Sequence, residues 1–482
     1  MENDSTKESV FEAARRTWAE GAPLRARRER MKRYTYGDQW SDPCLAPDGR
    51  VITEGDKAVM SGAMPITNNL MRQIVKSVVG RFRTLRAAER GDMDRALARV
   101  YRRNLLDELD ARSLEEFLIS GCAIQRVVSE RRPSGAGPWV DNVSPAKFFV
   151  NRHSDPRGSD IELIGMIHEI SLGELTMRFG RGDSQRVAEI ARCYSAYPEP
   201  ADDIFGRSAV SGRCRVVEVW TLEACEAVRC HDLENARAFV ASPSAIGAIE
   251  SLNRLRSSQG RRGVAWRRVP SVRWKGRFFT PSGLLLGEAR PQAHGCHPFA
   301  VKLYPLIDGE VHPFVEDIVD TQRHINRLIT LIDHIMGVSA KGALLFPMRA
   351  KHPEISWSEY ASRWSQPGAV IPYRESSAGA VPTQLTATGA NAGASDLLAI
   401  EMRLMEQISG VSSAMQGQKV EGLGGSAQLY NAQSDNAVTA LRDIFDTFGA
   451  FTASRDAMLS AMIRRRSGRQ KATVAHNAAV SD

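Results

Sequence analysis

The sequence lacks the features of a membrane-spanning or disulfide-linked protein. None of its 482 residues belongs to an apolar run of about 18 residues or more, so no stretch predicts a transmembrane helix. Its seven cysteines are an odd number and include no Cys-x-x-Cys pair, which predicts reduced thiols in a cytosolic setting. The first residues, MENDSTKESVFEAARR, do not place positive charge ahead of an apolar segment, so we expect no secretory leader.

Motifs of nucleotide-binding and hydrolytic enzymes are also missing. The sequence contains no Gly-x4-Gly-Lys-Ser/Thr loop, no His-Glu-x-x-His pair and no Gly-x-Ser-x-Gly elbow. The glycine-rich stretch 422–426 follows an expected helix rather than a strand, which disfavours a dinucleotide loop. We therefore predict no catalytic residue and no cofactor, although scattered Asp and His residues can still meet in three dimensions.

Metal-ligating residue types occur only in patterns that differ from known metal sites. Cys230-His231-Asp232 and His294-Gly295-Cys296-His297 lack the paired spacing that zinc ligands use. The acidic residues within 155–162 do not fit a calcium loop, and we interpret them as solvated turn residues. We predict no metal.

What the sequence does have is the composition of a folded chain with a basic excess. Hydrophobic residues make up 43% and charged residues 25%, which is typical of a folded protein, and the length predicts two or more structural regions. The net charge is +8, and 461–482 supplies five Arg and Lys against one Asp, a net +4. Such a basic tail suits nucleic-acid contact and equally suits a solvated end.

The clearest single element is a helix within 311–347. Apolar residues recur there at three-, four- and seven-residue steps, which places them on one face of a helix of roughly six turns. Pro313 precedes it and Gly337 is expected to end it. The opposite face is very polar for a core helix and carries Gln322, Arg323, Asn326, Arg327, Thr330, Asp333 and His334.

A second helix is predicted at 395–408, with an apolar stripe of Leu397, Leu398, Leu404, Met405 and Ile408. The intervening segment 338–394 is rich in Pro, Gly, Ala and Ser, and glycines follow the second helix. By periodicity alone, the pair is a helical hairpin with a long insertion.

Upstream, 6–33 predicts a helix that becomes strongly basic before the aromatic segment 34–40. It either grips phosphates and stacks on bases or is a surface helix with buried aromatics. A helix is predicted up to Gly80, and two more within 92–130. Strands follow at 215–222 and 266–279, separated by an insertion at 223–262 that we expect to be helical.

The order of these segments resembles the portal proteins of tailed bacteriophages. The segment LMEQISGVSSAMQGQ, the GGSA that follows it, the early Gly37, Gln39 and Trp40, and the shape NNLMRQIVKSVVG are similar to that family. The resemblance implies an α+β portal-type fold with a mixed α/β wing, a two-helix stem, a small clip and a long C-terminal helix. It assigns 1–312 to the wing, 313–337 and 395–408 to the stem helices, 338–394 to the clip, 409–425 to the tunnel loop, 426–463 to C-terminal wing and channel helices, and 464–482 to a basic tail, with the crown reduced or absent.

The resemblance further implies a ring oligomer, usually a dodecamer, at one capsid vertex of the virion, assembled in the host cytoplasm. The ring would be the channel for packaging and ejection of double-stranded DNA, bound without sequence preference. Its other partners would be the terminase large subunit, tail adaptor proteins, and capsid and scaffolding proteins, with no membrane. ATP hydrolysis would belong to the terminase, in keeping with the missing phosphate-binding loop.

Three sets of residues are the candidate sites. The DNA-facing tunnel loop would use Ser412, Ser413, Gln416, Gln418, Lys419, Gly422, Gly424 and Gly425. The polar face of the first stem helix would offer Arg323, Asn326, Arg327, Thr330, Asp333 and His334 to the channel. The clip would place Trp357, Tyr360, Trp364 and Tyr373 either between subunits or in a hydrophobic cluster of its own.

Two other classes of function remain open from the sequence. One is a nucleic-acid-processing enzyme with a basic N-terminal helix, and the other is a monomeric DNA-binding protein. Particle mass separates them from a portal, because only a portal predicts a ring.

Overall fold

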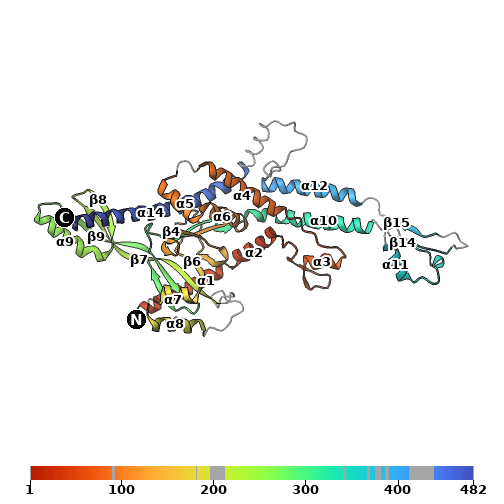
Figure 1. Ribbon diagram of the computed structural model, residues 1–482, viewed down its shortest axis with the longest axis horizontal. Helices are drawn as coiled ribbons and strands as arrows, with labels where there is room; N and C mark the ends of the chain where they lie inside the picture. Colours follow the sequence, from red (N-terminus) through yellow and green to blue (C-terminus); the bar gives the residue numbers. More distant parts are fainter. Residues whose placement is uncertain are drawn as a thin grey trace, which may run out of the picture. The chain divides into compact units, whose positions relative to one another are not determined.

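A computed structural model describes residues 2–89, 93–180, 182–195, 212–339, 343–365, 370–374, 381–385, 390–411 and 439–480 (Figure 1). The chain divides into two compact units. The first comprises residues 1–28, 82–313 and 443–482, and the second comprises 29–81 and 314–442. Two of the four boundaries fall within helices α2 (Ala22–Tyr36) and α4 (Leu70–Glu89).

The first unit is built on antiparallel sheets. Within the described residues, one sheet has six strands in the order β10-β9-β7-β6-β5, with β8 paired to β7, and another has the order β11-β3-β4. The strands of the larger sheet are β5 (Phe148–Val150), β6 (Leu163–Ser171), β7 (Arg213–Asp232), β8 (Arg237–Ala241), β9 (Val264–Phe279) and β10 (Leu285–Ala289). The smaller sheet uses β3 (Cys122–Arg132), β4 (Gly135–Asn142) and β11 (Phe299–Leu303). A short pair, β12 (Pro305–Ile307) and β13 (Glu310–Val311), follows.

These two sheets share one hydrophobic core. Ile124 and Phe299 of the smaller sheet pack in the same cluster as Ile164 and Trp220 of the larger one. Registry fixes this arrangement, because Ile164 pairs with Trp220 across β6 and β7, and a one-residue slip would turn each apolar side chain to the other face.

Helices complete the first unit. Phe11 and Trp18 of α1 (Glu2–Glu20) pack against Val217 and Phe279 of the larger sheet. The other helices are α5 (Arg95–Asn104), α6 (Leu106–Ser120), α7 (Leu172–Phe179), α8 (Ser184–Ser195), α9 (Ile246–Ser258) and α14 (Arg442–Val480), with single turns η2 (Pro145–Lys147) and η3 (Pro243–Ala245).

A buried arginine fastens α14 to the rest of this unit. Arg455 is fully buried and pairs with Asp110 of α6, and it donates to Gln125 Oε1 of β3 at 3.2 Å and to Tyr101 Oη of α5 at 2.6 Å. Asp456 also contacts this guanidinium at 3.0 Å, so loss of Asp110 would remove one of two carboxylate partners of a buried arginine and destabilise the unit.

A second buried cluster joins the two sheets. The Arg126 guanidinium of β3 contacts the Glu218 carboxylate of β7 at 2.9 Å, and His168 Nε2 lies 2.6 Å from the same carboxylate. Burial alone would raise the pKa of Glu218, but Arg126, His168 and the Trp220 indole stabilise its charged form and hold the pKa well below its usual range.

The second unit is mainly helical. Two short strands, β1 (Pro43–Leu45) and β2 (Val51–Thr53), precede α3 (Glu54–Met60), and the turn η4 (Phe314–Ile318) leads into α10 (Val319–Ser339). After α10 come β14 (Ala343–Leu345), η5 (Met348–Ala350), α11 (Trp357–Ser365), β15 (Thr383–Leu385) and α12 (Ala390–Ser409). Because β14 pairs with β15, α12 returns alongside α10 (Figure 1).

Several helix boundaries differ from the predicted ones. The structure continues α4 through Gly80 to Glu89, and α10 through Gly337 to Ser339. Neither glycine has a positive φ, so neither adopts the left-handed conformation that ends a helix. Helix α14 continues through the start of the predicted basic tail, and its backbone is helical to Val480.

The insertion predicted as helical at 223–262 is strand in its first part and helix in its second. β7 extends to Asp232 and pairs with β8 and with β9 before α9 begins at Ile246. Val228, Cys230, Ile249 and Val264 form a separate small core there. All seven cysteines are free thiols. In the described part of the chain, no helix has the length and apolar character to cross a membrane.

Candidate functional site

The polar face of α10 is occupied by the protein's own backbone. Gln322, Asn326 and Thr330 lie at four-residue intervals, so they form one row on the helix. Thr330 Oγ1 accepts from the backbone N–H of Ile66 at 3.0 Å, and Asn326 Oδ1 accepts from that of Asn68 at 3.1 Å. All three side chains are buried. We call this row, with segment 66–71, the polar ladder.

Gln322 performs two tasks in the polar ladder. Its Oε1 accepts from the backbone N–H groups of Leu70 and Met71 at 3.0 and 3.1 Å, and its Nε2 donates to the Asn68 carbonyl at 2.7 Å. Leu70 and Met71 begin α4, and the first N–H groups of a helix have no partner within it. Gln322 therefore caps α4 from another element.

An ion-pair cluster lies at the edge of this face. Arg323 and Arg327 of α10 both contact Glu54 at the start of α3, the latter at 2.7 Å. Burial alone would lower the pKa of Arg323, but Glu54 and its neighbours raise it above the usual arginine range. Asp333 is exposed, and His334 is partly buried.

The face of α10 that the sequence predicts to line a channel is therefore only partly exposed to solvent. The sequence predicts Asn326 and Thr330 to face the channel, and the structure instead buries them in the polar ladder, because backbone groups of 66–71 need partners that this helix supplies. Only Arg327 and Asp333 of the predicted set are exposed.

The aromatic segment 34–40, for which the sequence left both DNA contact and burial open, makes contacts within the chain. Tyr34 is buried and its hydroxyl donates to Asp42 Oδ2 at 2.9 Å, while the Trp40 indole donates to the Ile66 carbonyl at 3.3 Å. Burial, followed by the Asp42 contact, raises the pKa of Tyr34. Of the aromatics in this segment, the structure buries Tyr34 and partly buries Trp40, whereas Tyr36 is 55% exposed.

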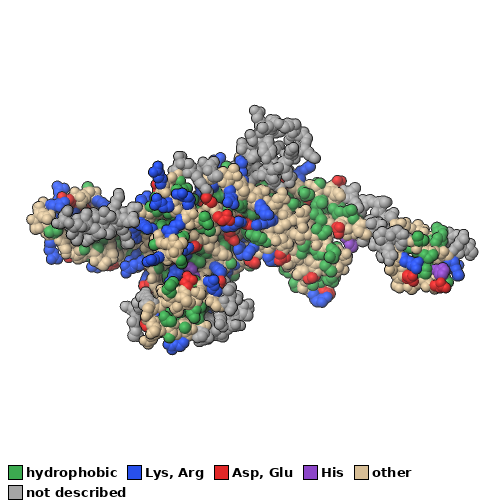
Figure 2. Space-filling view, viewed as in Figure 1, with side chains coloured by type: hydrophobic (Ala, Val, Ile, Leu, Met, Phe, Trp, Pro, Cys, Tyr) green, Lys and Arg blue, Asp and Glu red, His purple; other side chains and the backbone are tan. Residues whose placement is uncertain are grey.

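The apolar residues of α12 divide between two faces. Met405 is buried, whereas Leu397, Ile400, Leu404 and Ile408 are 38%, 53%, 39% and 49% exposed. The exposed residues recur at three- and four-residue steps and make one stripe, which we call the α12 stripe. Figure 2 shows hydrophobic side chains gathered over α12 and α10.

An ion pair lies between α10 and α12. His324 Nδ1 of α10 lies 2.8 Å from Glu401 Oε1 of α12. A cavity of about 250 Å³ lies between the start of α4 and α12, lined by Leu70, Gln73, Ile74, Met402, Arg403, Met405 and Glu406. The cavity opens beside residues of α12 that the second unit leaves exposed.

The predicted clip residues separate into buried and exposed ones. Tyr360 is buried, and its ring packs 4.6 Å from Phe346 and 5.9 Å from Trp357. Its hydroxyl donates to the Pro372 carbonyl at 2.8 Å and accepts from the His352 N–H at 3.1 Å. The other three are partly or wholly accessible, namely Trp357, Trp364 and Tyr373.

The predicted tunnel-loop residues lie outside the described residues. These are Ser412, Ser413, Gln416, Gln418, Lys419, Gly422, Gly424 and Gly425. The described chain ends on one side at Val411, which is buried, and resumes at Thr439.

The two clusters of metal-ligating residue types have other roles. His297 packs edge-on to Trp274 at 4.7 Å, and His294 Nδ1 accepts from the Cys296 N–H at 3.2 Å. Asp232 pairs with Arg256 at 2.7 Å. Among the described residues, no three His, Cys, Asp or Glu side chains gather as metal ligands would.

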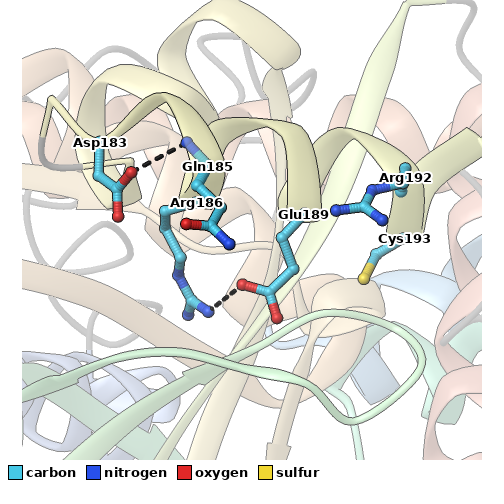
Figure 3. A pocket seen from close by; sticks show the side chains of 6 residues that line it. All are labelled: Asp183, Gln185, Arg186, Glu189, Arg192 and Cys193. Atoms are coloured by element: carbon cyan, nitrogen blue, oxygen red, sulfur yellow. Dashed lines mark hydrogen bonds and ion pairs between the residues drawn. The ribbon is translucent and has the colours of Figure 1, made fainter.

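A surface hollow of about 550 Å³ lies along α8 (Figure 3). Asp183 accepts from the backbone N–H of Gln185, and Arg186 pairs with Glu189 at 2.7 Å. Arg192 and Cys193 complete the lining. The side chains come from one helix and its preceding turn, so the hollow presents no convergent set of reactive groups from different elements.

The pairing of Gln322 and Asn326 with segment 66–71 is not predicted by the sequence. The four-residue spacing of the amide side chains is visible there, but a helix with a polar face predicts a solvated surface equally well. A weak additional signal is Asn68-Asn69 directly before an apolar helix, where Asn69 Oδ1 accepts from the Arg72 N–H at 3.0 Å as a local helix cap.

Comparison with protein families identifies the family of the chain. A family model described as phage P22-like portal protein matches residues 11–466 of the chain. A search of curated proteins finds none that matches it in sequence.

Proposed function

Because the chain belongs to the P22-like family of phage portal proteins, we propose that copies of it close into a ring whose stem is built from α10 and α12. The family supplies the portal of the capsid, through which the genome is packaged and by which head and tail connect. It is not an enzyme family, and it acts at the capsid vertex of the virion.

The α12 stripe is the observation that supports ring formation. Four aliphatic side chains in one row stay exposed in the second unit, and a contiguous apolar surface of this kind marks an interface. A contact between two different faces of identical copies, repeated around a closing rotation, gives a ring. We propose that the stripe packs against the stem of the neighbouring copy, in a ring that is dodecameric, as the resemblance implies.

The polar ladder gives that stem its rigidity. A helix whose buried side chains bond the backbone of 66–71 at three successive positions resists rotation about its own axis. The exposed Arg327 and Asp333 remain as candidates for a channel surface that contacts DNA without reading bases.

We propose the remaining roles that the resemblance implies on the same basis. The clip, with Trp357, Trp364 and Tyr373 accessible, would dock the terminase large subunit during packaging and tail adaptor proteins later. Capsid and scaffolding proteins would hold the wing. The glycine-rich segment 409–425 would contact the moving duplex, and assembly would take place in the host cytoplasm.

The direct test is the mass and shape of the purified full-length chain. Light scattering should give a particle of ten or more times the 53.1 kDa subunit mass, and negative stain should show a central hole. A stable monomer that cleaves or modifies nucleic acid would instead establish the enzyme alternative. A stable monomer without such activity would leave the DNA-binding alternative.

A second experiment addresses the tunnel-loop assignment. With Gly424→Pro, which restricts the backbone, we expect the ring to assemble and DNA packaging to fall. Loss of the ring would show instead that 409–425 is required for assembly.

A further inference from the structure

Two arginines of the first unit converge on a single backbone carbonyl. Arg103 Nη1 of α5 and Arg466 Nη1 of α14 each donate to the Ala136 carbonyl at 3.1 Å. Ala136 lies in β4 between Gly135 and Gly137 and pairs with Arg131 of β3, next to the turn that connects the two strands, and we call this end of the β3–β4 hairpin the hairpin tip. The two guanidinium groups therefore lie close together although they carry the same charge.

Two glycines of the hairpin leave space for the arginine side chains to reach the Ala136 carbonyl. Gly135 and Gly137 have φ values of +124° and +152°, which side chains rarely adopt. A Cβ at Gly137 would lie 2.9 Å from Arg103 Nη1 and 3.0 Å from Arg466 Nη1. Glycine thus provides both the turn and the space beside it.

The positive charge at this tip is not neutralised by the described residues. Neither Arg103 nor Arg466 has a carboxylate partner among them, and Arg103 Nη2 is buried without a hydrogen-bond partner there. A buried donor left unpaired costs about 1–3 kcal/mol. The neighbouring Arg132 differs, because Asp141 and Glu130 pair with it.

A tryptophan holds the Arg103 guanidinium in place. Arg103 lies over the Trp139 ring at 4.1 Å, and Arg132 lies over the same ring at 4.9 Å. Stacking on an aromatic face fixes the plane of a guanidinium. Such a group is already oriented to form paired hydrogen bonds with an oxyanion.

The surface beside the tip carries further exposed cations. Arg95, Arg99 and Arg102 of α5 are exposed, and their spacing places them on one side of the helix over about 10 Å. Helix α5 contains no acidic residue. Figure 2 shows Lys and Arg side chains gathered over α5.

We propose that the β3–β4 hairpin tip, with Arg103 and Arg466, is a site for backbone phosphates of nucleic acid, continued by the arginine row of α5. A row of like charges suits a polymer with regularly repeated negative charge better than it suits a single carboxylate. No base readout is expected, because phosphate contacts position a protein without selecting sequence. The choice of duplex DNA as the polymer rests on the proposed function, whereas the geometry selects phosphate.

The test compares Arg103→Gln/Arg466→Gln with Arg112→Gln in the full-length protein. Arg112 is a matched control, because it is an exposed arginine of the same unit that carboxylates already neutralise. Binding of a mixed-sequence duplex is followed by fluorescence anisotropy over a range of salt concentrations, and light scattering of each sample reports the assembled state.

We expect the double variant to bind duplex DNA about tenfold more weakly or worse, by the strength of a charge-assisted hydrogen bond. The slope of log affinity against log salt should decrease by about one for each phosphate that the variant no longer neutralises. The control should match the wild type. Wild-type affinity and slope in the double variant, with assembly intact, would overturn this site and leave the portal function standing.

A single-residue variant and a competition experiment complete the test. If Arg103→Gln impairs folding through its Trp139 stack, Arg466→Gln alone carries the test, since that side chain is exposed, and an unchanged affinity then refutes the site. Poly-glutamate of equal charge should compete poorly with the duplex. Equal competition would overturn the assignment to phosphate. Absence of a ring in the wild type would count against the proposed function, while the comparison of DNA affinities would still decide the site.

Discussion

Replacing Asn326 with alanine tests whether the polar face of α10 is structural. Asn326 is fully buried, and its Nδ2 donates to Gln39 Oε1 at 2.5 Å. Its Oδ1 accepts from the Asn68 N–H at 3.1 Å and from Gln322 Nε2 at 3.0 Å. Alanine removes these three hydrogen bonds and leaves three polar groups buried beside a small cavity.

The size of the effect follows from these hydrogen bonds. Each contributes about 1 kcal/mol net, and each buried group left unpaired costs about 1–3 kcal/mol. Because some of the groups will find water, we expect about 3–5 kcal/mol of local destabilisation. A change of about 3 kcal/mol in local opening corresponds to roughly hundredfold faster amide exchange.

Hydrogen exchange read by mass spectrometry on peptides covering 66–71 measures this directly. The matched control is Asp333→Ala on the same helix, whose side chain is exposed, and a surface substitution of this kind changes stability by about 0.5 kcal/mol or less. If Asn326→Ala leaves both the exchange of 66–71 and the melting temperature like those of Asp333→Ala, the polar ladder does not hold the stem. Asn326 would then be free to face a channel.

Three other substitutions test the clip, the stem surface and the first unit. Tyr360→Phe should speed amide exchange near Pro372, with protection reduced by about 1–3 kcal/mol, whereas Tyr373→Phe, at an exposed residue, should not. Ile400→Asp should prevent ring formation, seen by light scattering as disappearance of the large particle with an unchanged circular-dichroism spectrum. The same change at Met177, which is 79% exposed, should leave the ring intact. Burial lowers the pKa of His297 from 6.5 to about 4, so the unfolded chain binds a proton in that range and the folded chain does not. Stability should fall as pH drops from 6.5 to 4, by up to about 3 kcal/mol, and His297→Gln should flatten this dependence in melting curves. A wild type equally stable at both pH values would show that the imidazole titrates normally.

The spacing of apolar residues in the sequence predicts where helices form. It does not predict which face of a helix is covered by other parts of the protein. The three- and four-residue spacing identifies α10 and α12, whose observed bounds are Val319–Ser339 and Ala390–Ser409. The same spacing places Leu404 and Met405 in one apolar stripe, although only Met405 is buried. Neighbouring positions on a helix lie about 100° apart, so a wide stripe spans two surfaces, and only tertiary packing decides which of them is covered.

Helix ends at glycines and the pairing of nearby strands are likewise poorly predicted from local sequence pattern. Gly80 and Gly337 mark predicted helix ends, but a glycine within a helix costs only about 1 kcal/mol, which packing of Val75 and Val78 in α4 offsets. The strand pairing of β7 with β8 joins residues that lie close in the sequence, from Asp232 with Arg237 to Val228 with Ala241, so a helical interpretation of 223–262 overlooks a hairpin. Trp357 is 45% exposed although its ring packs against Phe346 and Tyr360, so both alternatives that the sequence left for this residue stay open.

The two proposed surfaces differ in physical character, because one is apolar and the other is positively charged. This difference affects how salt would act on the assembly of a portal and on its contact with DNA. The polar ladder uses the amide groups of α10 within its own chain, so the surface left for a neighbouring copy is the aliphatic α12 stripe. An apolar contact is largely independent of salt, whereas phosphate contacts at Arg103 and Arg466 weaken steeply as salt rises. A ring held by the first kind of contact stays closed under conditions in which DNA binds or leaves the second. If both proposals hold, substitutions should change assembly and DNA contact separately, because the two would depend on different residues and on different forces.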